Sequence, residues 1–271
     1  MTNTMEITPQ VCEAVRRAAA ILEGRPEQVI QKGNNSNYVT DADLRVQQSL
    51  EHDLTALIPG SVVLGEENKV WNHDSSYAWI VDPIDGTSNF IRDLGASCIS
   101  VALMKGEELI SGVIYNPYRN ELFYGETGCG AWLNGTRIHV SDRDYAHSHL
   151  CAAMSLYDKR FAPQCFRIIE RIYEHTDDLR RFGSAAMEVA QLAAGRVELY
   201  FEIRIAPWDV AAGALLIQEA GGVYECLYDK GMQADKMFPF IAANSPENFE
   251  QLRRIVTEEL PVIPYPQNLV L

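Results

Sequence analysis

The chain has 271 residues, 47% of them hydrophobic, and a formal net charge of −14 at pH 7. This length allows one large or two medium domains, and the hydrophobic content is ordinary for a globular protein with a core, so we expect a folded rather than a disordered chain. The acidic balance argues against a nucleic-acid-binding surface, which needs basic residues to neutralise phosphate charges.

The six cysteines are scattered without C-x-x-C spacing, so the sequence indicates neither a zinc site nor a disulfide framework. No uninterrupted apolar run reaches membrane-spanning length, and the N-terminus lacks a basic region followed by an apolar core. We therefore expect a soluble, cytoplasmic protein that does not enter membranes.

Two helices are predicted near the N-terminus. The first covers residues 8–22, with Thr8 as its N-cap. The second follows a segment in which Thr40, Asp41 or Asp43 is read most simply as a cap or a first-turn acid. These acids alone indicate no chemistry.

The next segments predict two short buried strands, each followed by acidic residues. Residues 61–64 run into Gly65-Glu66-Glu67, which alone indicates only an acidic loop. Residues 78–81 form the second strand, which we expect to end at Asp82-Pro83, because proline removes a backbone donor. Two carboxylates, Asp82 and Asp85, therefore follow the end of one strand.

The segment after this strand suggests an anion site. Asp85-Gly86 turns the chain, and glycine lets the backbone amides of Gly86 and Thr87 approach an anion closely. Carboxylates beside an anion require cations between them, and hard oxygen ligands suit Mg²⁺. The pattern favours metal-assisted phosphate chemistry, with a solvated acidic surface turn as the alternative.

The middle of the chain changes character. Residues 98–140 are short segments divided by turn dipeptides, which predicts an antiparallel meander. A polar cluster over residues 142–149 indicates a domain boundary. After a helix near residues 163–175, Ser184 is predicted to cap a helix rich in small residues. The start of that helix either approaches a ligand with its free amides or serves close packing alone.

The remaining elements are a strand, a helix, a strand and a helix. The strand over residues 197–203 contains Glu202 and leads to Asp209, near the start of a helix that ends at Gly221-Gly222. Asp209 alone is well explained as a first-turn acid. A strand over residues 240–243 and a helix near residues 247–260 complete the prediction.

Together these segments resemble the inositol monophosphatase family. The string Asp82-Pro83-Ile84-Asp85-Gly86-Thr87, followed by Asn89-Phe90, is similar to the family box D-P-[IL]-D-G-T-x-N-F. Trp208-Asp209-Val210-Ala211-Ala212-Gly213 is similar to the second signature, W-D-x-A-A-G. Val39 to Asp43 fits the V-T-x-x-D box, and Gly65-Glu66-Glu67 fits the G-E-E box.

The resemblance implies a fold. The family has an α/β layered αβαβα sandwich, with an α+β N-terminal half that binds metal and an α/β C-terminal half that completes the active site. On this basis the first half covers residues 1–145 and the second covers residues 146–271. The active site is expected between the two halves.

The resemblance also implies the roles of individual residues. The catalytic set is Asp43, Thr87, Glu66 and Lys32, in which Thr87 and Asp43 orient and deprotonate water and Lys32 supports metal-bound waters. Two Mg²⁺ ions, with a third and weaker one near Glu66, are expected on Glu66, Asp82, the Ile84 carbonyl, Asp85 and Asp209. The expected substrate contacts are Asp85, Gly86, Thr87, Gly183, Ser184, Ala185, Glu202 and Arg204.

The substrate is less well defined. Ser88-Asn89-Phe90 resembles the inositol monophosphatase branch more than the nucleotide bisphosphate branch, which favours a small polyol phosphate such as inositol monophosphate. Arg204 also suits a second phosphate or a carboxylate, so fructose 1,6-bisphosphate, histidinol phosphate and nucleotide phosphates stay open. The resemblance further implies lithium sensitivity and a homodimer, and it leaves open a non-catalytic, partner-binding relative.

Overall fold

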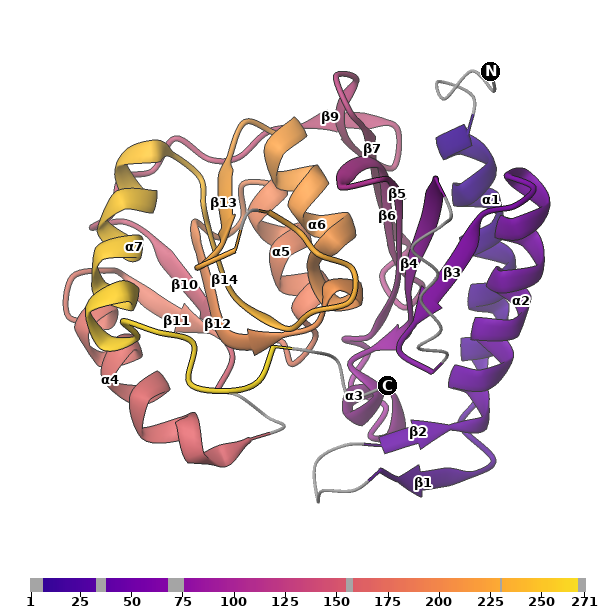
Figure 1. Ribbon diagram of the computed structural model, residues 1–271, viewed down its shortest axis with the longest axis horizontal. Coiled ribbons are helices and arrows are strands. Elements are labelled where there is room, and N and C mark those ends of the chain that lie inside the picture. The colour runs from indigo at the N-terminus through magenta and orange to yellow at the C-terminus, as the bar shows by residue number, and fades with distance from the viewer. Residues whose placement is uncertain (1–6, 33–37, 68–75, 155–157, 230, 268–271) are drawn as a thin grey trace.

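The computed structural model describes residues 7–32, 38–67, 76–154, 158–229 and 231–267, and within these residues helices and sheets alternate in five layers (Figure 1). From right to left in Figure 1 the layers are helices α1 and α2, a large sheet, helices α5 and α6, a small sheet, and helices α4 and α7. This is the layered αβαβα sandwich expected from the sequence.

The first outer layer contains α1 (Ile7–Ala19), which a 3₁₀ turn (Ala20–Glu23) extends, and α2 (Asp41–Leu57). The prediction that Thr8 caps the first helix is wrong. Thr8 lies inside α1 and is buried, and its hydroxyl donates to Glu126 Oε2 at 2.8 Å, which satisfies that carboxylate. The start of α2 does carry a predicted cap, because Thr40 Oγ1 accepts from the Asp43 amide at 3.3 Å.

The large sheet confirms the predicted antiparallel meander. Strands β3 and β4 run parallel, and every later pair is antiparallel. Successive side chains of β4 point to opposite faces of the sheet, so Trp79 and Val81 pack under α1 and α2 while Ile80 packs toward α5 and α6. In spatial order the strands are β3 (Val62–Gly65), β4 (Tyr77–Asp85), β5 (Cys98–Lys105), β6 (Glu108–Asn116), β7 (Glu121–Glu126), β8 (Gly130–Leu133) and β9 (Thr136–Ile138).

The small sheet mixes parallel and antiparallel pairs, and its outer face is covered by α4 (Ala162–Tyr173) and α7 (Pro246–Glu259). A 3₁₀ turn (Lys159–Phe161) precedes α4. In spatial order the strands are β11 (Asp178–Arg180), β10 (His149–Ala152), β12 (Leu199–Ile205), β14 (Phe238–Ala243) and β13 (Val223–Cys226).

Helices α5 (Ala185–Ala193) and α6 (Pro207–Glu219) lie between the two sheets and share one core with both. The large sheet therefore uses strands from residues 62–138, and one of its faces is covered by helices from the second half of the chain. The division at residues 145 and 146 stays a prediction. No helix within the described residues is both long and apolar enough to cross a membrane.

Several short elements were not predicted. A two-stranded ribbon pairs β1 (Val29–Gln31) with β2 (Tyr38–Thr40), and the five-residue helix α3 (Thr87–Ile91) follows β4 directly. The strands β10, β11 and β13 were also missed. Such elements are too short for hydrophobic periodicity to distinguish them from loops.

Close packing between α5 and α6 gives a stability prediction. A Cβ at Gly213 would lie 2.0 Å from Val189 Cγ2, far inside contact distance. Gly213→Ala is therefore expected to destabilise the fold by about 1–3 kcal/mol, although alanine favours helix by about 1 kcal/mol. Urea unfolding measures the change. Val189→Ala should restore part of the loss when added to Gly213→Ala, and unchanged stability of the single variant would contradict the prediction.

Candidate active site

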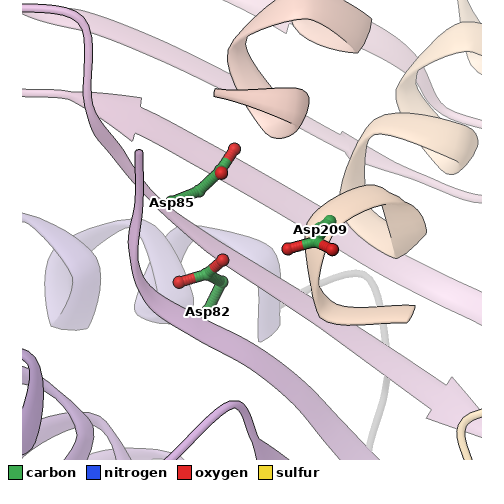
Figure 2. A group of neighbouring side chains, drawn as sticks. All are labelled: Asp82, Asp85 and Asp209. Atoms are coloured by element: carbon green, nitrogen blue, oxygen red, sulfur yellow. The ribbon is translucent and has the colours of Figure 1, made fainter. Parts of the chain in front are cut away.

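Asp82 and Asp85 reach the same space because β4 is irregular where they lie. The strand was predicted to end at Asp82, but it continues to Asp85 with a register shift between these two residues, next to Pro83. In a regular strand, residues three apart point to opposite faces. The irregularity removes this constraint, and the two carboxylates point toward a common space in Figure 2.

Asp209 completes the group from the other half of the chain. It lies in the first turn of α6, where its Oδ2 accepts from the Ala206 amide at 3.1 Å and Pro207 begins the helix. One carboxylate oxygen from each of Asp82, Asp85 and Asp209 lies within 4.8 Å of the others (Figure 2). The elements that carry this group belong to both predicted halves.

Asp85 also connects β4 to the start of α5. Its Oδ2 accepts a hydrogen bond from Ser184 Oγ at 2.7 Å and another from the Ala186 amide. Ser184 caps α5 as predicted, since its hydroxyl also accepts from the Met187 amide. The amides at the start of α5 thus hold one oxygen of Asp85 in place and partly offset its charge.

The electrostatics of the group favour a bound cation. Burial, followed by the charges of Glu66, Asp85 and Asp209, raises the pKa of Asp82 well above its ordinary value. Burial and then Asp85 raise the pKa of Asp209 in the same way. No lysine or arginine among the described residues forms an ion pair with any of the three aspartates. Close, buried carboxylate oxygens without a cationic partner fit a hard divalent ion such as Mg²⁺.

Glu66 lies beside this group at the end of β3. Lys32 Nζ is 3.5 Å from Glu66 Oε1, and it also forms an ion pair with Glu67. Burial is the main cause that raises the pKa of Glu66, and the Lys32 charge opposes it. Lys32 therefore contacts both glutamates of the predicted acidic loop, with Glu66 facing the pocket.

Asp43 and Thr87 form a pair next to the aspartates. Thr87 Oγ1 lies 3.4 Å from Asp43 Oδ1 and donates to the Ile84 carbonyl at 3.0 Å. The other oxygen of Asp43 accepts from the Thr40 amide at 2.7 Å and the Thr40 hydroxyl at 2.6 Å. Asp43 thus serves as a capping residue of α2 and also presents a carboxylate oxygen to Thr87.

One pocket collects most of the predicted site. Gly86 precedes α3 with φ of +86°, a left-handed conformation that favours glycine, and this places the start of α3 beside Asp85. The predicted residues that line the pocket are Glu66, Asp82, Ile84, Asp85, Gly86, Thr87, Gly183, Ser184, Ala185, Glu202 and Asp209. Asp43 and Lys32 contact this set through Thr87 and Glu66.

Arg204 is placed differently. It is not among the described residues that line the pocket, and its guanidinium carbon lies 5.2 Å from the centre of the Tyr265 ring. Its buried Nε has no hydrogen-bond partner within the described residues. A role for Arg204 in substrate binding stays a prediction.

Comparison with known proteins identifies the family. The family model described as "Inositol monophosphatase family" matches residues 3–260. The chain belongs to this family. Nus factor SuhB of Xylella fastidiosa is 39% identical over 211 residues, covering 77% of this chain and 75% of that protein. Inositol-1-monophosphatase of Caulobacter vibrioides is 35% identical over 253 residues, covering 89% and 98% respectively.

A solved structure of the family has the same fold. The inositol monophosphatase of Anabaena (Nostoc) sp. matches with a TM-score of 0.83 and 32% identity, covering 97% of this chain and 100% of that one. The names of the relatives differ, since one is an inositol-1-monophosphatase and another is a Nus factor. Family membership thus supports the fold and leaves the individual activity to be tested.

The pocket of this family member includes residues that were not predicted to belong to the site, namely Tyr38, Ser88, Ala153, Arg181 and Glu188. Glu188 lies near the start of α5, where a glutamate is usually explained by the helix dipole. Arg181 lies two residues before Gly183 and gave no separate signal. These residues lie in or directly after β2, α3, β10, β11 and α5, so only the tertiary packing of these elements brings them to one pocket.

The raised carboxyl pKa values predict how stability depends on pH and metal. Between the ordinary pKa values and the raised ones, the folded state holds more protons than the unfolded state, so stability falls as pH rises. For Glu66 this window extends from 4.5 to about 7. In EDTA, the free energy of unfolding should be lower at about pH 8 than at about pH 5, measured by urea unfolding.

Millimolar Mg²⁺ is expected to reverse this trend, because an ion that binds only the folded, ionised site stabilises it. NaCl at the same ionic strength controls for general screening and should not restore stability to the same extent. A metal-free protein that becomes steadily more stable up to about pH 8 would show that these carboxyls are not unfavourably buried.

Proposed function

We propose that this chain is a Mg²⁺-dependent phosphomonoester hydrolase that acts on a small polyol phosphate, with inositol monophosphate as the first candidate. The observation that carries the proposal is the group of Asp82, Asp85 and Asp209, in which one carboxylate oxygen of each residue lies within 4.8 Å of the others in a pocket. Membership of the inositol monophosphatase family supports the same reaction class.

In this proposal the metal ions would be held by Glu66, Asp82, the Ile84 carbonyl, Asp85 and Asp209. When bound, Mg²⁺ supplies positive charge to the phosphate oxygens and lowers the pKa of a coordinated water. The hydrogen bonds from Ser184 and Ala186 to Asp85 keep one of its oxygens fixed and leave the other directed elsewhere. These hydrogen bonds keep the Asp85 carboxylate from rotating, which suits a side chain that binds a metal ion.

The protein's own groups orient the reactants. Thr87, paired with Asp43, holds the attacking water, and Asp43 takes its proton. The amides of Gly86 and Thr87 hold the phosphate at the start of α3. Lys32, beside Glu66, supports the waters around the ions. Water is the nucleophile, so no covalent phosphoenzyme is expected.

Glu202, buried at 6% exposure and lining the pocket, supports a substrate with hydroxyl groups. Gly183, Ser184 and Ala185 also line the pocket. Fructose 1,6-bisphosphate, histidinol phosphate and a nucleotide phosphate are the alternative substrates. The sequence suggested Arg204 as the cation for a second phosphate, but Arg204 is not among the described residues that line the pocket.

A second candidate function is partner binding, and it is favoured by the similarity to a protein named Nus factor SuhB. The net charge of −14 favours a protein partner over direct contact with nucleic acid. We also propose a cytoplasmic location and a homodimer, and light scattering on the purified protein tests the homodimer.

Phosphate release from a substrate panel tests the enzyme proposal. The panel is myo-inositol 1-phosphate, fructose 1,6-bisphosphate, histidinol phosphate, adenosine 3′,5′-bisphosphate and NADP, each with Mg²⁺, with EDTA and with added Li⁺. We expect preference for inositol phosphate, loss of activity in EDTA and inhibition by Li⁺. Absence of release from every substrate would reject the hydrolase proposal and favour partner binding, which a pull-down from lysate would then examine.

A further inference from the structure

Glu188 is a buried carboxylate that the proposed reaction does not use. It is 1% exposed and lines the pocket from α5. Its Oε1 accepts from the Phe182 amide at 2.7 Å and the Gly183 amide at 3.1 Å, which fixes the loop before the helix. Its Oε2 has no hydrogen-bond partner in the part of the chain that the structure describes.

Glu202 presents a similar group from β12. Its Oε2 accepts from the Tyr200 hydroxyl at 3.0 Å, and its Oε1 has no partner among the described residues. Burial is the main cause that raises the pKa of Glu202 to about 8, and the Glu188 charge adds to it. Two buried carboxylates on different elements therefore line one pocket, each with one oxygen held and one oxygen free.

Arg181 lines the same pocket and is exposed. Its charge acts on both glutamates, since it lowers the pKa of Glu188 and of Glu202 against the effect of burial. Two divalent ions would offset the charges of Glu66, Asp82, Asp85 and Asp209, which leaves Glu188 and Glu202 facing one guanidinium. Above the pKa values of about 7 for Glu188 and about 8 for Glu202, both carboxyls are ionised, and the part of the pocket that they line is then unfavourable for a second anionic group.

We propose that Glu188 is a specificity-determining residue whose free oxygen accepts a hydrogen bond from the substrate body. Together with Glu202, it selects phosphate monoesters whose body is rich in hydrogen-bond donors and has no second anionic group. This inference rests on the proposed phosphatase function and deepens it. A buried acceptor that loses its donor is costly, so a ring without hydroxyls should be discriminated against.

Glu188→Gln tests the proposal, because an amide oxygen can still accept from Phe182 and Gly183 while the second carboxylate oxygen is replaced by a donor. The substrates are myo-inositol 1-phosphate, cyclohexyl phosphate, which has the same ring without hydroxyls, and fructose 1,6-bisphosphate. At about pH 9, where both glutamates are ionised, we expect KM for inositol phosphate to rise about tenfold with little change in kcat, since a hydrogen bond to a charged group is lost. KM for cyclohexyl phosphate should stay unchanged. The ratio of KM for fructose 1,6-bisphosphate to KM for inositol phosphate should fall.

Glu198→Gln is the matched control, because Glu198 is equally buried, also accepts from a backbone amide, and does not line the pocket. Glu198→Gln should leave the ratio of KM for cyclohexyl phosphate to KM for inositol phosphate unchanged. If Glu188→Gln raised KM equally for inositol phosphate and cyclohexyl phosphate, or changed neither value, the inference would be overturned and the hydrolase proposal would stand. Wild-type protein that hydrolyses none of the substrates would reject both.

Thermal unfolding shows whether Glu188→Gln folds. Where it does not, the wild-type protein alone decides. A KM for cyclohexyl phosphate equal to or below that for inositol 1-phosphate would overturn the inference, and a KM at least about tenfold higher would support joint selection of hydroxyl groups by Glu188 and Glu202.

Discussion

Asp209→Asn is expected to lower kcat/KM for a phosphate monoester about 1,000-fold in saturating Mg²⁺, which corresponds to about 4 kcal/mol of lost transition-state stabilisation. The reason is local. Asparagine keeps an oxygen for the Ala206 amide but loses the negative charge that Asp209 adds to the group with Asp82 and Asp85. Phosphate release at increasing Mg²⁺ concentrations measures the effect, and the Mg²⁺ requirement should rise as the rate falls.

The same variant should have the opposite effect on stability without metal. In EDTA near neutral pH, Asp209→Asn is expected to unfold at a higher urea concentration than the wild type, because it removes one of several buried like charges. Mg²⁺ should then stabilise the variant less than the wild type. Asp177→Asn, an exposed change outside the pocket, is the control and should alter neither quantity. Full Mg²⁺-dependent turnover by Asp209→Asn would rule out the proposed ligand set.

The order of helices and strands was largely readable from the sequence because most elements carry a clear pattern. The meander over β5 to β9 is divided by turn residues, and α5 begins at a good N-cap, Ser184. The layering was not readable from periodicity. Helix α6 is buried nearly all round, so its sequence shows no polar face that would tell which sheet it covers. That information came from the family resemblance.

The candidate site also combines features that the sequence revealed with features that only the structure shows. The local boxes located Asp82, Asp85 and Asp209, but their convergence depends on a break in strand alternation that no hydrophobic pattern encodes. A similar break explains the place of Arg204. Regular alternation would put Arg204 on the face of Glu202, yet β12 is irregular between Glu202 and Ile205, and the guanidinium lies over Tyr265 instead.

Glu188 and Arg181 were missed for another reason. Glu188 has an ordinary explanation as a first-turn acid of α5, Arg181 carries no local signal, and only tertiary packing brings them to the pocket beside Glu202. A single sequence therefore locates residues that lie in strong local motifs. It does not locate residues that reach a site from elements whose relative position is set by the core.

Asp43 and Thr87 are expected to act as one unit. Asp43 is held by two hydrogen bonds from Thr40, so its free oxygen points to Thr87 Oγ1 at 3.4 Å. Burial raises the pKa of Asp43 to about 6, and the base must be ionised to accept a proton. The kcat of the wild type should thus rise with pH up to about 6, and Asp43→Asn should lose this dependence.

A double-mutant cycle tests the unit. Asp43→Asn and Thr87→Ala are each expected to lower kcat by about 100- to 1,000-fold with a small change in KM, since general base catalysis contributes effects of this size. The double variant should be no more than about threefold slower than the slower single variant, because the second change removes a group that the first has already made ineffective. Thr87→Ser keeps the hydroxyl and should remain within about tenfold of the wild type. Losses that multiply in the double variant would instead mean that the two side chains contribute independently, and the proposed transfer of the proton to Asp43 would then be wrong.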